Sequence, residues 1–445
     1  MKTILPSLLC LASLLSAQEP PKDPFIKEAK KNSAPPPAAA IEDRTNIALL
    51  VETFTLPQSL HASLLAEEEG REKLHPRVLA AVKDGTATLD AFHFVRTRSG
   101  TRSRLHSSEE FIFPVDWNTA APETGLQYPK SFEMQPMGDV FEFEPVFEND
   151  GAAISVNSSF TRARFHGFRP AQADRTKLGA VVASISRPQV LSSVRMLPGI
   201  PSLLGSHSHE GGTLLVFGTP QLLRIEPPAQ PVSKGAGNFS LTPRIVSLDR
   251  KTAWELLRQH PDGGPQLAAA LQKLLASKQA VLEHISTLTG TPGTRVVHDS
   301  GGQFYYGSEF DPPFPGLPAS PAVDEKTPAQ RAVPPNPASV TAFECRQLGF
   351  RCEMEPVLTA HQTDLASINL SVSFTHHNGD VQDEHWSTHY PQLPLFLEQN
   401  VTTDIIQALG STILVGTLSP PGETGINGRK DEARAWLLLL ETVME

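Results

Sequence analysis

The sequence predicts an α+β fold in which one module occurs twice in tandem, each copy having a short α/β segment followed by an antiparallel β-sheet. Three observations predict it: a segment that repeats along the chain, a strand-like alternation of apolar and charged residues, and a leucine stripe with helical spacing. The chain has 445 residues, a formal net charge of −10 and 39% hydrophobic residues, which is typical of a globular protein with two domains. A negative chain without a lysine or arginine cluster argues against nucleic acid as the main partner.

The repeat is carried by residues that recur at a constant offset of 211. Phe132-Glu133, Gly138, Glu142 and Glu144-Pro145-Val146 return as Phe343-Glu344, Gly349, Glu353 and Glu355-Pro356-Val357. Further on, Val190, Gly199 and Gly205 return as Val401, Gly410 and Gly416 at the same offset. Between these segments, the residues from Ile154 align with those from Ile368 at an offset of 214, which predicts about three inserted residues near His361 to Asp364. A repeat this long indicates two copies of one structural module, so function is expected in the module and in how two are joined.

The domain boundaries follow from the repeat and from three proline-rich stretches. One positive charge precedes a short apolar run that ends in Ser16-Ala17, which predicts a secretory signal peptide and an exported chain. Proline-rich stretches favour extended conformations over a packed core. The predicted parts are a signal peptide at 1–17, a Pro/Ala-rich linker at 18–44, module 1 at 45–222, a linker at 223–240, and module 2 at 241–445 with a Pro-rich insertion at 312–339.

Strands are predicted where the sequence has a period of two. Phe141-Glu142-Phe143-Glu144 and Cys352-Glu353-Met354-Glu355 alternate apolar and charged residues, the pattern of a half-buried strand. Val401–Leu409 and Thr412–Leu418 flank Gly410-Ser411, which predicts a strand, a tight turn and a strand. A last strand is expected at Trp436–Glu441, where it would close the sheet as Leu214–Phe217 does in the first copy.

Helices are predicted early in each copy. Leu267, Leu271, Leu274 and Leu275 form one apolar stripe between Gly264 and Ser277. Leu74, Val78 and Val82 form a shorter equivalent, and Gly85 is a suitable helix end.

Two cysteines, Cys345 and Cys352, bracket Leu348-Gly349 and leave two alternatives open. If the dipeptide is a hairpin turn, the cysteines face each other and a disulfide could form in an exported protein. If the segment is one continuous strand, their odd separation puts them on opposite faces and no disulfide forms. The first copy has Met134 and Phe141 at these positions, so the fold does not require the bond.

Several groupings of polar residues have a chemical and a structural interpretation. His298-Asp299-Ser300-Gly301-Gly302 is similar to a serine-protease nucleophile loop, but no base histidine with its aspartate is evident, and a polar turn explains it better. The glutamate pairs, Glu142 with Glu144 and Glu353 with Glu355, are interpreted as the solvent side of their strands. The histidine-rich stretch from His376 to His389 is interpreted as a solvated loop. The sequence therefore predicts no catalytic residues, no cofactor, no metal site and no enzyme.

The order of these elements resembles a known family. Val401-Thr402-Thr403, followed by Gly410, Thr412, Gly416 and Leu418, is similar to the Val-Thr-Thr strand and the glycine-turned hairpin in the C-terminal homology domain of the bacterial secretins, the ring-forming channel proteins of type II and type III secretion. The first copy keeps Gly199, Leu204 and Gly205 but has Pro198 and Pro201 in the hairpin. The chain thus resembles a divergent tandem duplication of that domain. The expected module signature is Phe132, Glu133, Gly138, Glu144, Pro145, Gly199, Gly205, Phe343, Glu344, Gly349, Glu355, Pro356, Val401, Thr402, Thr403, Gly410 and Gly416.

The resemblance implies an exported structural or assembly protein of the bacterial cell envelope, periplasmic or associated with the outer membrane, that acts by protein–protein contacts in a secretion or pilus-type complex. Its partners would be envelope proteins or further copies of itself, and membrane association would require oligomeric β-structure because no segment suits a transmembrane helix. The alternative is a soluble periplasmic binding or scaffold protein that retains the module without forming a channel. The chain departs from the family in lacking evident gate and lip segments, and in carrying two modules where a ring of one module per protomer is usual.

Overall fold

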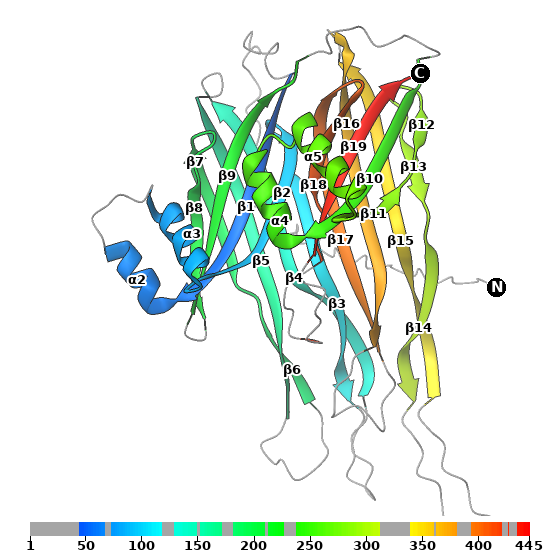
Figure 1. The fold of residues 1–445 in the computed structure, drawn as a ribbon. Coiled ribbons are helices and arrows are strands. Elements are labelled where there is room, and N and C mark those ends of the chain that lie inside the picture. The colour runs from blue at the N-terminus through cyan, green and yellow to red at the C-terminus, as the bar shows by residue number, and fades with distance from the viewer. Residues whose placement is uncertain are drawn as a thin grey trace, which may run out of the picture. The chain divides into compact units, whose positions relative to one another are not determined.

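The computed structural model describes residues 44–66, 73–117, 129–148, 152–170, 181–209, 212–226, 237–311, 339–359, 362–380, 393–420, 426 and 434–445. These residues form two antiparallel β-sheets and four helices, which confirms the predicted β-rich α+β class (Figure 1). Within this part of the chain, no helix is long and apolar enough to cross a membrane. The signal peptide predicted at 1–17, and nearly all of the linker at 18–44 and the insertion at 312–339, lie outside the described residues.

One sheet, here sheet A, has the strand order β11-β10-β19-β18-β2-β1-β9-β8, with β12 also paired to β10. Its strands are β1 (Thr45–Pro57), β2 (Thr88–Arg98), β8 (Ser202–His209), β9 (Gly212–Arg224), β10 (Phe239–Asp249), β11 (Ala280–Ile285), β12 (Leu288–Gly290), β18 (Ser411–Thr417) and β19 (Arg434–Met444).

The other sheet, sheet B, has the order β13-β15-β16-β17-β3-β4-β5-β6, with β7 also paired to β5 and β14 paired to β15 and, at one point, to β4. Its strands are β3 (Ser103–Trp117), β4 (Pro129–Glu148), β5 (Ala153–Pro170), β6 (Val181–Ser186), β7 (Gln189–Met196), β13 (Val296–Asp299), β14 (Gly302–Asp311), β15 (Ser339–Thr359), β16 (Gln362–Asp380) and β17 (Pro394–Ala408).

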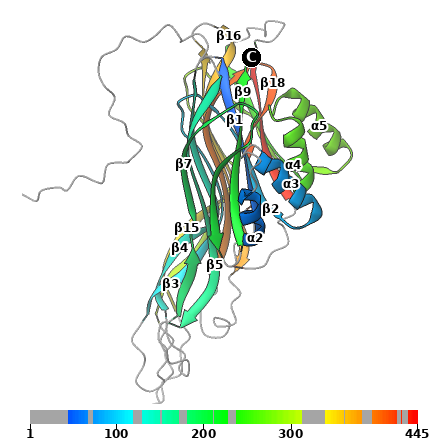
Figure 2. The ribbon, with the colours of Figure 1, turned by 90° about the vertical axis from the view of Figure 1, so that its left-hand side faces the viewer.

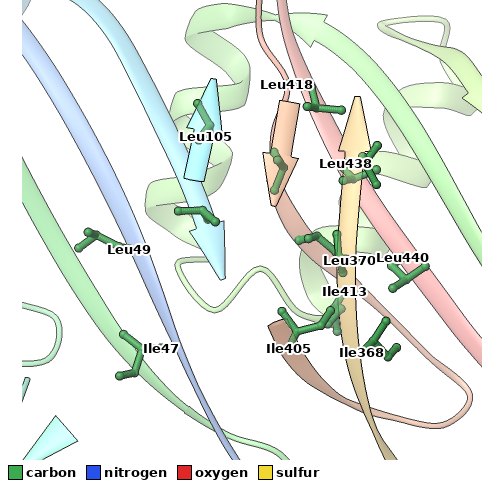
Figure 3. Packing of buried hydrophobic residues seen from close by; sticks show 14 of the residues in the cluster. Ile47, Leu49, Leu105, Ile368, Leu370, Ile405, Ile413, Leu418, Leu438 and Leu440 are labelled. Carbon is green, nitrogen blue, oxygen red and sulfur yellow. The ribbon is translucent and has the colours of Figure 1, made fainter. Parts of the chain in front are cut away.

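The main core lies between the two sheets and takes side chains from both ends of the chain. This cluster joins Ile47 and Leu49 of β1 in sheet A with Leu105 of β3, Ile368 of β16 and Ile405 of β17 in sheet B, and Figure 3 shows these side chains. A second core lies between sheet A and the helices, which cover its other face (Figure 2). Because both of its faces are covered, β1 is buried at nearly every position and lacks the alternation of a half-buried strand.

The helices are α2 (Gln58–Ala66), α3 (Leu74–Asp84), α4 (Arg250–Gln259) and α5 (Pro265–Ala276). The structure confirms the two predicted helices: Val78 of α3 and Leu267 and Leu271 of α5 are buried, and Gly85 ends α3 in the left-handed conformation. The sequence did not predict α2 or α4. In α4, Asp249 caps the helix by accepting a bond from the Thr252 amide at 2.9 Å.

The first half of the chain (44–226) and the second half (237–445) pass through the sheets in the same order. In sheet A the first half supplies β2-β1-β9-β8 and the second half supplies β11-β10-β19-β18. In sheet B the first half supplies β3-β4-β5-β6 with β7, and the second half supplies β13 and β14, then β15-β16-β17. The halves therefore lie beside each other, edge to edge, in both sheets.

The strands predicted around Gly410 are present, but their expected pairing as a hairpin is wrong. The strand before the turn, β17, lies in sheet B, and the strand after it, β18, lies in sheet A. Gly410 takes a positive φ of 76°, and its amide donates to the Thr442 carbonyl of β19 at 2.7 Å. The glycine turn therefore carries the chain across the core from one sheet to the other.

The offset of 214 between Ile154 and Ile368 is also wrong. Pro145 pairs with Val156, whereas Pro356 pairs with Ile368, so Ile368 occupies the place of Val156 and the offset is 212. A slip of two residues keeps every side chain on the same face of a strand. The apolar alternation therefore identified the inward side of the strand without fixing its register.

Candidate assembly surface: the junction between the halves and the open edges

The halves meet where two sheet-crossing segments lie against each other, and we call this region the junction. In sheet B, β17 pairs with β3 from Phe396↔Glu110 to Thr402↔Arg104. In sheet A, β18 pairs with β2 at Gly416↔Val95. Each half thus extends the sheets of the other through main-chain hydrogen bonds, as an added strand extends a sheet edge.

The Val-Thr-Thr segment of the expected signature lies at the junction. Val401 is buried opposite Leu105. The Thr403 hydroxyl lies 2.8 Å from the Ser103 hydroxyl and donates to the Arg96 carbonyl at 2.6 Å. The inward residues of this segment therefore bind the first half at the point where its chain passes from β2 to β3.

Gly416 allows the two sheets to approach each other at the junction. A Cβ at this position would lie 3.2 Å from the Phe94 carbonyl oxygen and 3.2 Å from either Cγ of Val401. The next residue, Thr417, accepts a bond from the Phe94 amide at 3.1 Å. The signature glycine is therefore explained by a close main-chain approach between the halves.

Buried polar groups add specific bonds across the junction. The Asn46 side chain donates to the Ile406 carbonyl at 2.7 Å and accepts from the Ile406 amide at 2.8 Å, as a strand partner would. Arg98 donates to Ser367 at 2.9 Å and lies 3.5 Å from Asp404. Burial raises the pKa of Asp404, and Arg98 opposes that rise. Each of these groups from the first half needs its partner in the second.

The second half also covers the helix side of the junction. Trp254 of α4 donates to the buried carboxylate of Glu52 at 2.6 Å, and His75 of α3 contacts the same carboxylate at 2.8 Å. Arg96 donates to the Asp262 carbonyl in the α4–α5 loop. Burial lowers the pKa of Arg96 to about 10, and Asp262 opposes that change.

On the outer side of sheet B, an arginine lies between two carboxylates that come from different halves. Glu110 of β3 accepts from Arg346 Nε at 2.7 Å, and the same guanidinium lies 3.2 Å from Glu398 of β17. Burial raises the pKa of Glu110 to about 7, Arg346 opposes the rise, and Glu398 adds to it. The positively charged guanidinium of Arg346 thus lies between two carboxylates, one from each half.

Each end of the sheets has the strand arrangement found on one side of the junction but, among the described residues, no strands from the other side pair with it. At the first-half end, β7 crosses to β8; at the second-half end, β12 crosses to β13, and no further strand of the described chain pairs outside β8 or β13. Apolar side chains are exposed at both ends, including Leu191 (60%) and Val297 (54%). We call these two ends the open edges. A row of free main-chain groups with apolar side chains favours pairing with another chain.

The signature glycines and prolines occupy matching places in the two halves. Gly199 and Gly410 both have φ of 76°, and their amides donate at 2.7 Å to carbonyls of β9 and β19, respectively. Pro145 and Pro356 are buried, and their carbonyls accept the amides of Gly100 and Gly293 at 2.7 and 2.8 Å. Gly205 faces Val190 as Gly416 faces Val401.

The aromatic and acidic members of the signature are less alike. Phe132 is partly buried, 5.6 Å from Phe310, whereas Phe343 is 66% exposed. Glu133 is exposed and accepts from Gln135 at 2.9 Å, whereas Glu344 accepts from Tyr306 at 2.8 Å. Gly138 and Gly349, which follow these residues in β4 and β15, both have positive φ.

The acidic strand positions lie on the outer side, as expected. Glu142 and Glu144 each lie within 4 Å of an arginine, at 3.4 Å from Arg104 and 3.7 Å from Arg102. Glu353 binds Arg351 and Arg295 at 2.7 and 2.8 Å. Glu355 is exposed.

The disulfide considered for Cys345 and Cys352 does not form. Both thiols are free, with Cys345 exposed and Cys352 buried, because β15 runs straight through both residues. The continuous-strand alternative is therefore the one that holds. Burial raises the pKa of the Cys352 thiol to about 12, and the nearby Glu353 adds to this effect.

The remaining polar groupings have structural partners. The Ser300 hydroxyl donates to the Phe350 carbonyl at 3.4 Å. His377 stacks on Phe304 and lies 3.4 Å from Asp380, and the stretch from 381 to 392 lies outside the described residues. Across the described part of the chain, no cluster of three His, Cys, Asp or Glu residues could hold a metal ion.

One buried cluster was missed by the sequence reasoning. Arg162 binds Asp139 at 2.7 and 2.8 Å and Asp90 at 3.1 Å, and His93 lies 3.1 Å from Asp139 across the core. Burial would raise the pKa of Asp139, but Arg162 and then His93 hold it well below its usual range. The only sequence signal for this cluster was a charged residue at a strand position where the alternation predicts an apolar one.

No protein-family model matches the chain, and no curated protein matches it. Similar solved structures are secretins, each at low identity. They include the secretin domain of InvG from the Salmonella SPI-1 injectisome (8% identity, 49% of this chain, 69% of that chain, TM-score 0.24), the type II secretin GspD from enteropathogenic Escherichia coli (11%, 40%, 69%, 0.19) and the type IV competence pilus secretin PilQ from V. cholerae (8%, 90%, 61%, 0.22).

Proposed function

We propose that the chain is an exported structural protein of the bacterial cell envelope that works by edge-to-edge contacts between secretin-like modules, as part of a secretion or pilus-type complex. In this proposal the two halves are a tandem duplication of one module. The junction is the observation that carries it: modules of this kind join in both sheets at once, through strand pairing and bonds such as those of Thr403.

The position of the signature residues supports an assembly role. Val401, Thr403 and Gly416 lie at the contact between the two halves. Residues needed for chemistry would instead be expected around a pocket with perturbed acids or bases. Residues needed for assembly are expected where one module meets the next.

The alternative, a soluble periplasmic scaffold that stays monomeric, is favoured by one observation. Pro188 precedes β7, and Pro198 and Pro201 flank the turn between β7 and β8. Proline has no amide hydrogen to donate, and natural proteins use it to protect sheet edges from pairing.

Membrane extraction separates the two functions. Cells producing the full chain are fractionated, and membranes extracted in detergent are run on a gel with and without boiling. An assembly protein is expected as a large, heat-labile multimer in the membrane fraction. A monomer confined to the soluble periplasmic fraction would contradict assembly and favour the scaffold.

A matched pair of variants tests whether the bonds of Thr403 hold the two halves together at the junction. Thr403→Val removes the hydroxyl that bonds to Ser103 and to the Arg96 carbonyl while keeping the side chain's size. It should weaken the contact between the halves and lower the temperature at which the chain itself unfolds. Thr402→Val, one residue away but exposed, should leave that temperature unchanged.

A further inference from the structure

The open edges of the molecule match each other in the way that the two sides of the junction do. We propose that two copies of this chain bind head to tail, with β7 and β8 of one copy against β13 and β12 of the next, in the register of the junction. This inference rests on the proposed function and adds to it the partner, a second copy of the chain, and the residues that meet.

The register in sheet B follows from the junction pair Val401↔Leu105. Val190 matches Val401, because each faces the glycine of the following strand. His298 matches Leu105, because they pair with Cys352 and Phe141, which the 211-residue offset relates. Val190 of one copy is therefore placed opposite His298 of the next.

The register in sheet A is consistent with this placement. At the junction, Gly416 pairs with Val95. Gly205 matches Gly416. Leu288 matches Val95, because Leu288 pairs with Leu241 of β10 as Val95 pairs with Leu49 of β1. An offset of 193 residues relates Val95 to Leu288 and also Leu105 to His298. Both sheets thus give the same alignment of the two edges.

The side chains that would meet are apolar and exposed. One step from Val190 and His298, Leu191 is placed opposite Val297, and these side chains are 60% and 54% exposed. The matching junction residues, Thr402 and Arg104, are polar. Directly opposed apolar residues stabilise an antiparallel pair, so the open edges carry a contact that the internal junction lacks.

The contact in sheet B is shorter than the junction. Pro188 occupies the place of Gln399 and has no amide hydrogen, so the pairing ends there. Only Gln189↔Asp299, Val190↔His298 and Leu191↔Val297 remain, against the seven pairs between β17 and β3. The junction within a chain is therefore expected to outlast the contact between chains when an assembly is heated.

The contact is heterologous, because the edge formed by β7 and β8 differs from the edge formed by β12 and β13. Heterologous contacts generate rings when the rotation closes and filaments when it does not. Each chain would then occupy two successive positions in the assembly. A two-module chain would thus suit a ring of modules that contains an even number of them.

Cysteine cross-linking tests the register. In the full chain with Cys10→Ser and Cys345→Ser, Leu191→Cys is made in one preparation and Val297→Cys in another. Opposed residues of an antiparallel pair have Cβ atoms about 4.5–5.5 Å apart, close to the span of a disulfide. After mixing, dissociation and reassembly under mild oxidation, we expect a disulfide-linked dimer from the mixture and none from either preparation alone.

Val281→Cys, combined with Leu191→Cys in the same way, is the matched control. Val281 is 45% exposed on β11 but is not opposite Leu191 in the proposed register, so the linked dimer should be lost. A charge exchange gives a second readout: Leu191→Lys alone should reduce the heat-labile multimer, and adding Val297→Asp should restore it.

The outcomes are distinct. A linked dimer from Leu191→Cys alone would indicate a two-fold contact and overturn the proposal. A heat-labile multimer without the link between positions 191 and 297, or a link to another protein only, would overturn the register while leaving the proposed function in place. A chain that forms neither multimer nor link would overturn both.

Discussion

The two halves of the chain hold their sheets together with different chemistry at matching positions. In the first half, Asp139 of β4 pairs with Arg162 of β5, and His93 reaches Asp139 from the opposite sheet. In the second half, the matching strands carry Phe350 paired with Phe374. A histidine from the opposite sheet, His284, stacks on Phe350 with 3.8 Å between the ring centroids. One backbone arrangement thus accommodates a buried ion pair or an aromatic stack.

The difference shows what each solution requires. Two buried charges are tolerated only when each has its partner, because removing either leaves an uncompensated charge in the core. Aromatic rings need only shape and contact area, so apolar residues of similar volume can replace them at modest cost. The stability of the first half is therefore expected to be sensitive to acid and to substitution of either member of its ion pair. The stability of the second half is expected to depend on the volume of the side chains in its aromatic stack.

Breaking the ion pair should give the largest effect. Asp139→Ala leaves the buried Arg162 guanidinium with Asp90 as its remaining acid, and loss of one partner of a buried pair costs about 3–5 kcal/mol. The free energy of unfolding, measured by urea denaturation, should fall by that amount. Phe350→Leu, at the matching position, should cost less than about 1.5 kcal/mol. Equal losses at the two positions would show that the halves do not differ in this way.

A pH effect of intermediate size should come from the junction. The folded pKa of Glu110 is raised to about 7, whereas the unfolded value is about 4.3. The folded state thus binds this proton more tightly, so the contribution of Glu110 to the free energy of unfolding is fully present below about pH 4.3 and is lost as the pH rises through about 7, by on the order of 3 kcal/mol.

Glu110→Gln should flatten stability between pH 5 and 8, because glutamine does not titrate. Asp139 should behave in the opposite sense, since its depressed pKa gives stability that is lost only in acid, below the unfolded value of about 3.9. Denaturation midpoints measured from about pH 2 to about pH 8 separate the two groups, since Asp139 acts at the acid end and Glu110 at the neutral end. An unchanged slope in the Glu110→Gln variant would refute the assignment.

A smaller effect should distinguish the closed junction from the open edge. Gly416→Ala brings a methyl group against the Phe94 carbonyl and the buried Val401, and overpacking of this kind costs about 1–3 kcal/mol. Gly205→Ala brings its methyl group closer still, to 2.5 Å from Cγ1 of Val190, but the nearest atoms all belong to that half-buried side chain and none to the main chain, so the neighbour can shift. Thermal unfolding should show the larger loss for Gly416→Ala, and the reverse order would argue against the distinction.

The smallest effect is expected at the cysteines. Cys345→Ser changes an exposed thiol and should alter the free energy of unfolding by less than about 0.5 kcal/mol. In the native protein, an alkylating reagent followed by peptide mass mapping should modify Cys345 and leave Cys352 unmodified, because only the thiolate reacts and Cys352 is buried with a pKa of about 12. Equal labelling of both would indicate that β15 opens readily.

Much of the local structure could be predicted from the sequence because it depends on neighbours along the chain. The stripe of Leu267 and Leu271 predicted α5, and Gly85 predicted the end of α3. The pattern Phe141-Glu142-Phe143-Glu144 predicted which side of β4 faces the core. The helices α2 and α4 were missed because sheet A and their contacts, such as that of Trp254 with Glu52, stabilise them more than their own sequence pattern does.

The sequence by itself determined that the chain carries matching segments, which side of each predicted strand is buried, and that Gly410 marks a turn. Only the tertiary structure decided that this turn leads from one sheet to the other, that Ile368 occupies the place of Val156, and that Val401 and Gly416 lie at the contact between the halves. The physical reason is that alternation fixes a face but not a register, and partners far apart in the chain leave no periodic signal. The Asp139–Arg162 pair, which needs His93 from the opposite sheet, is the clearest example.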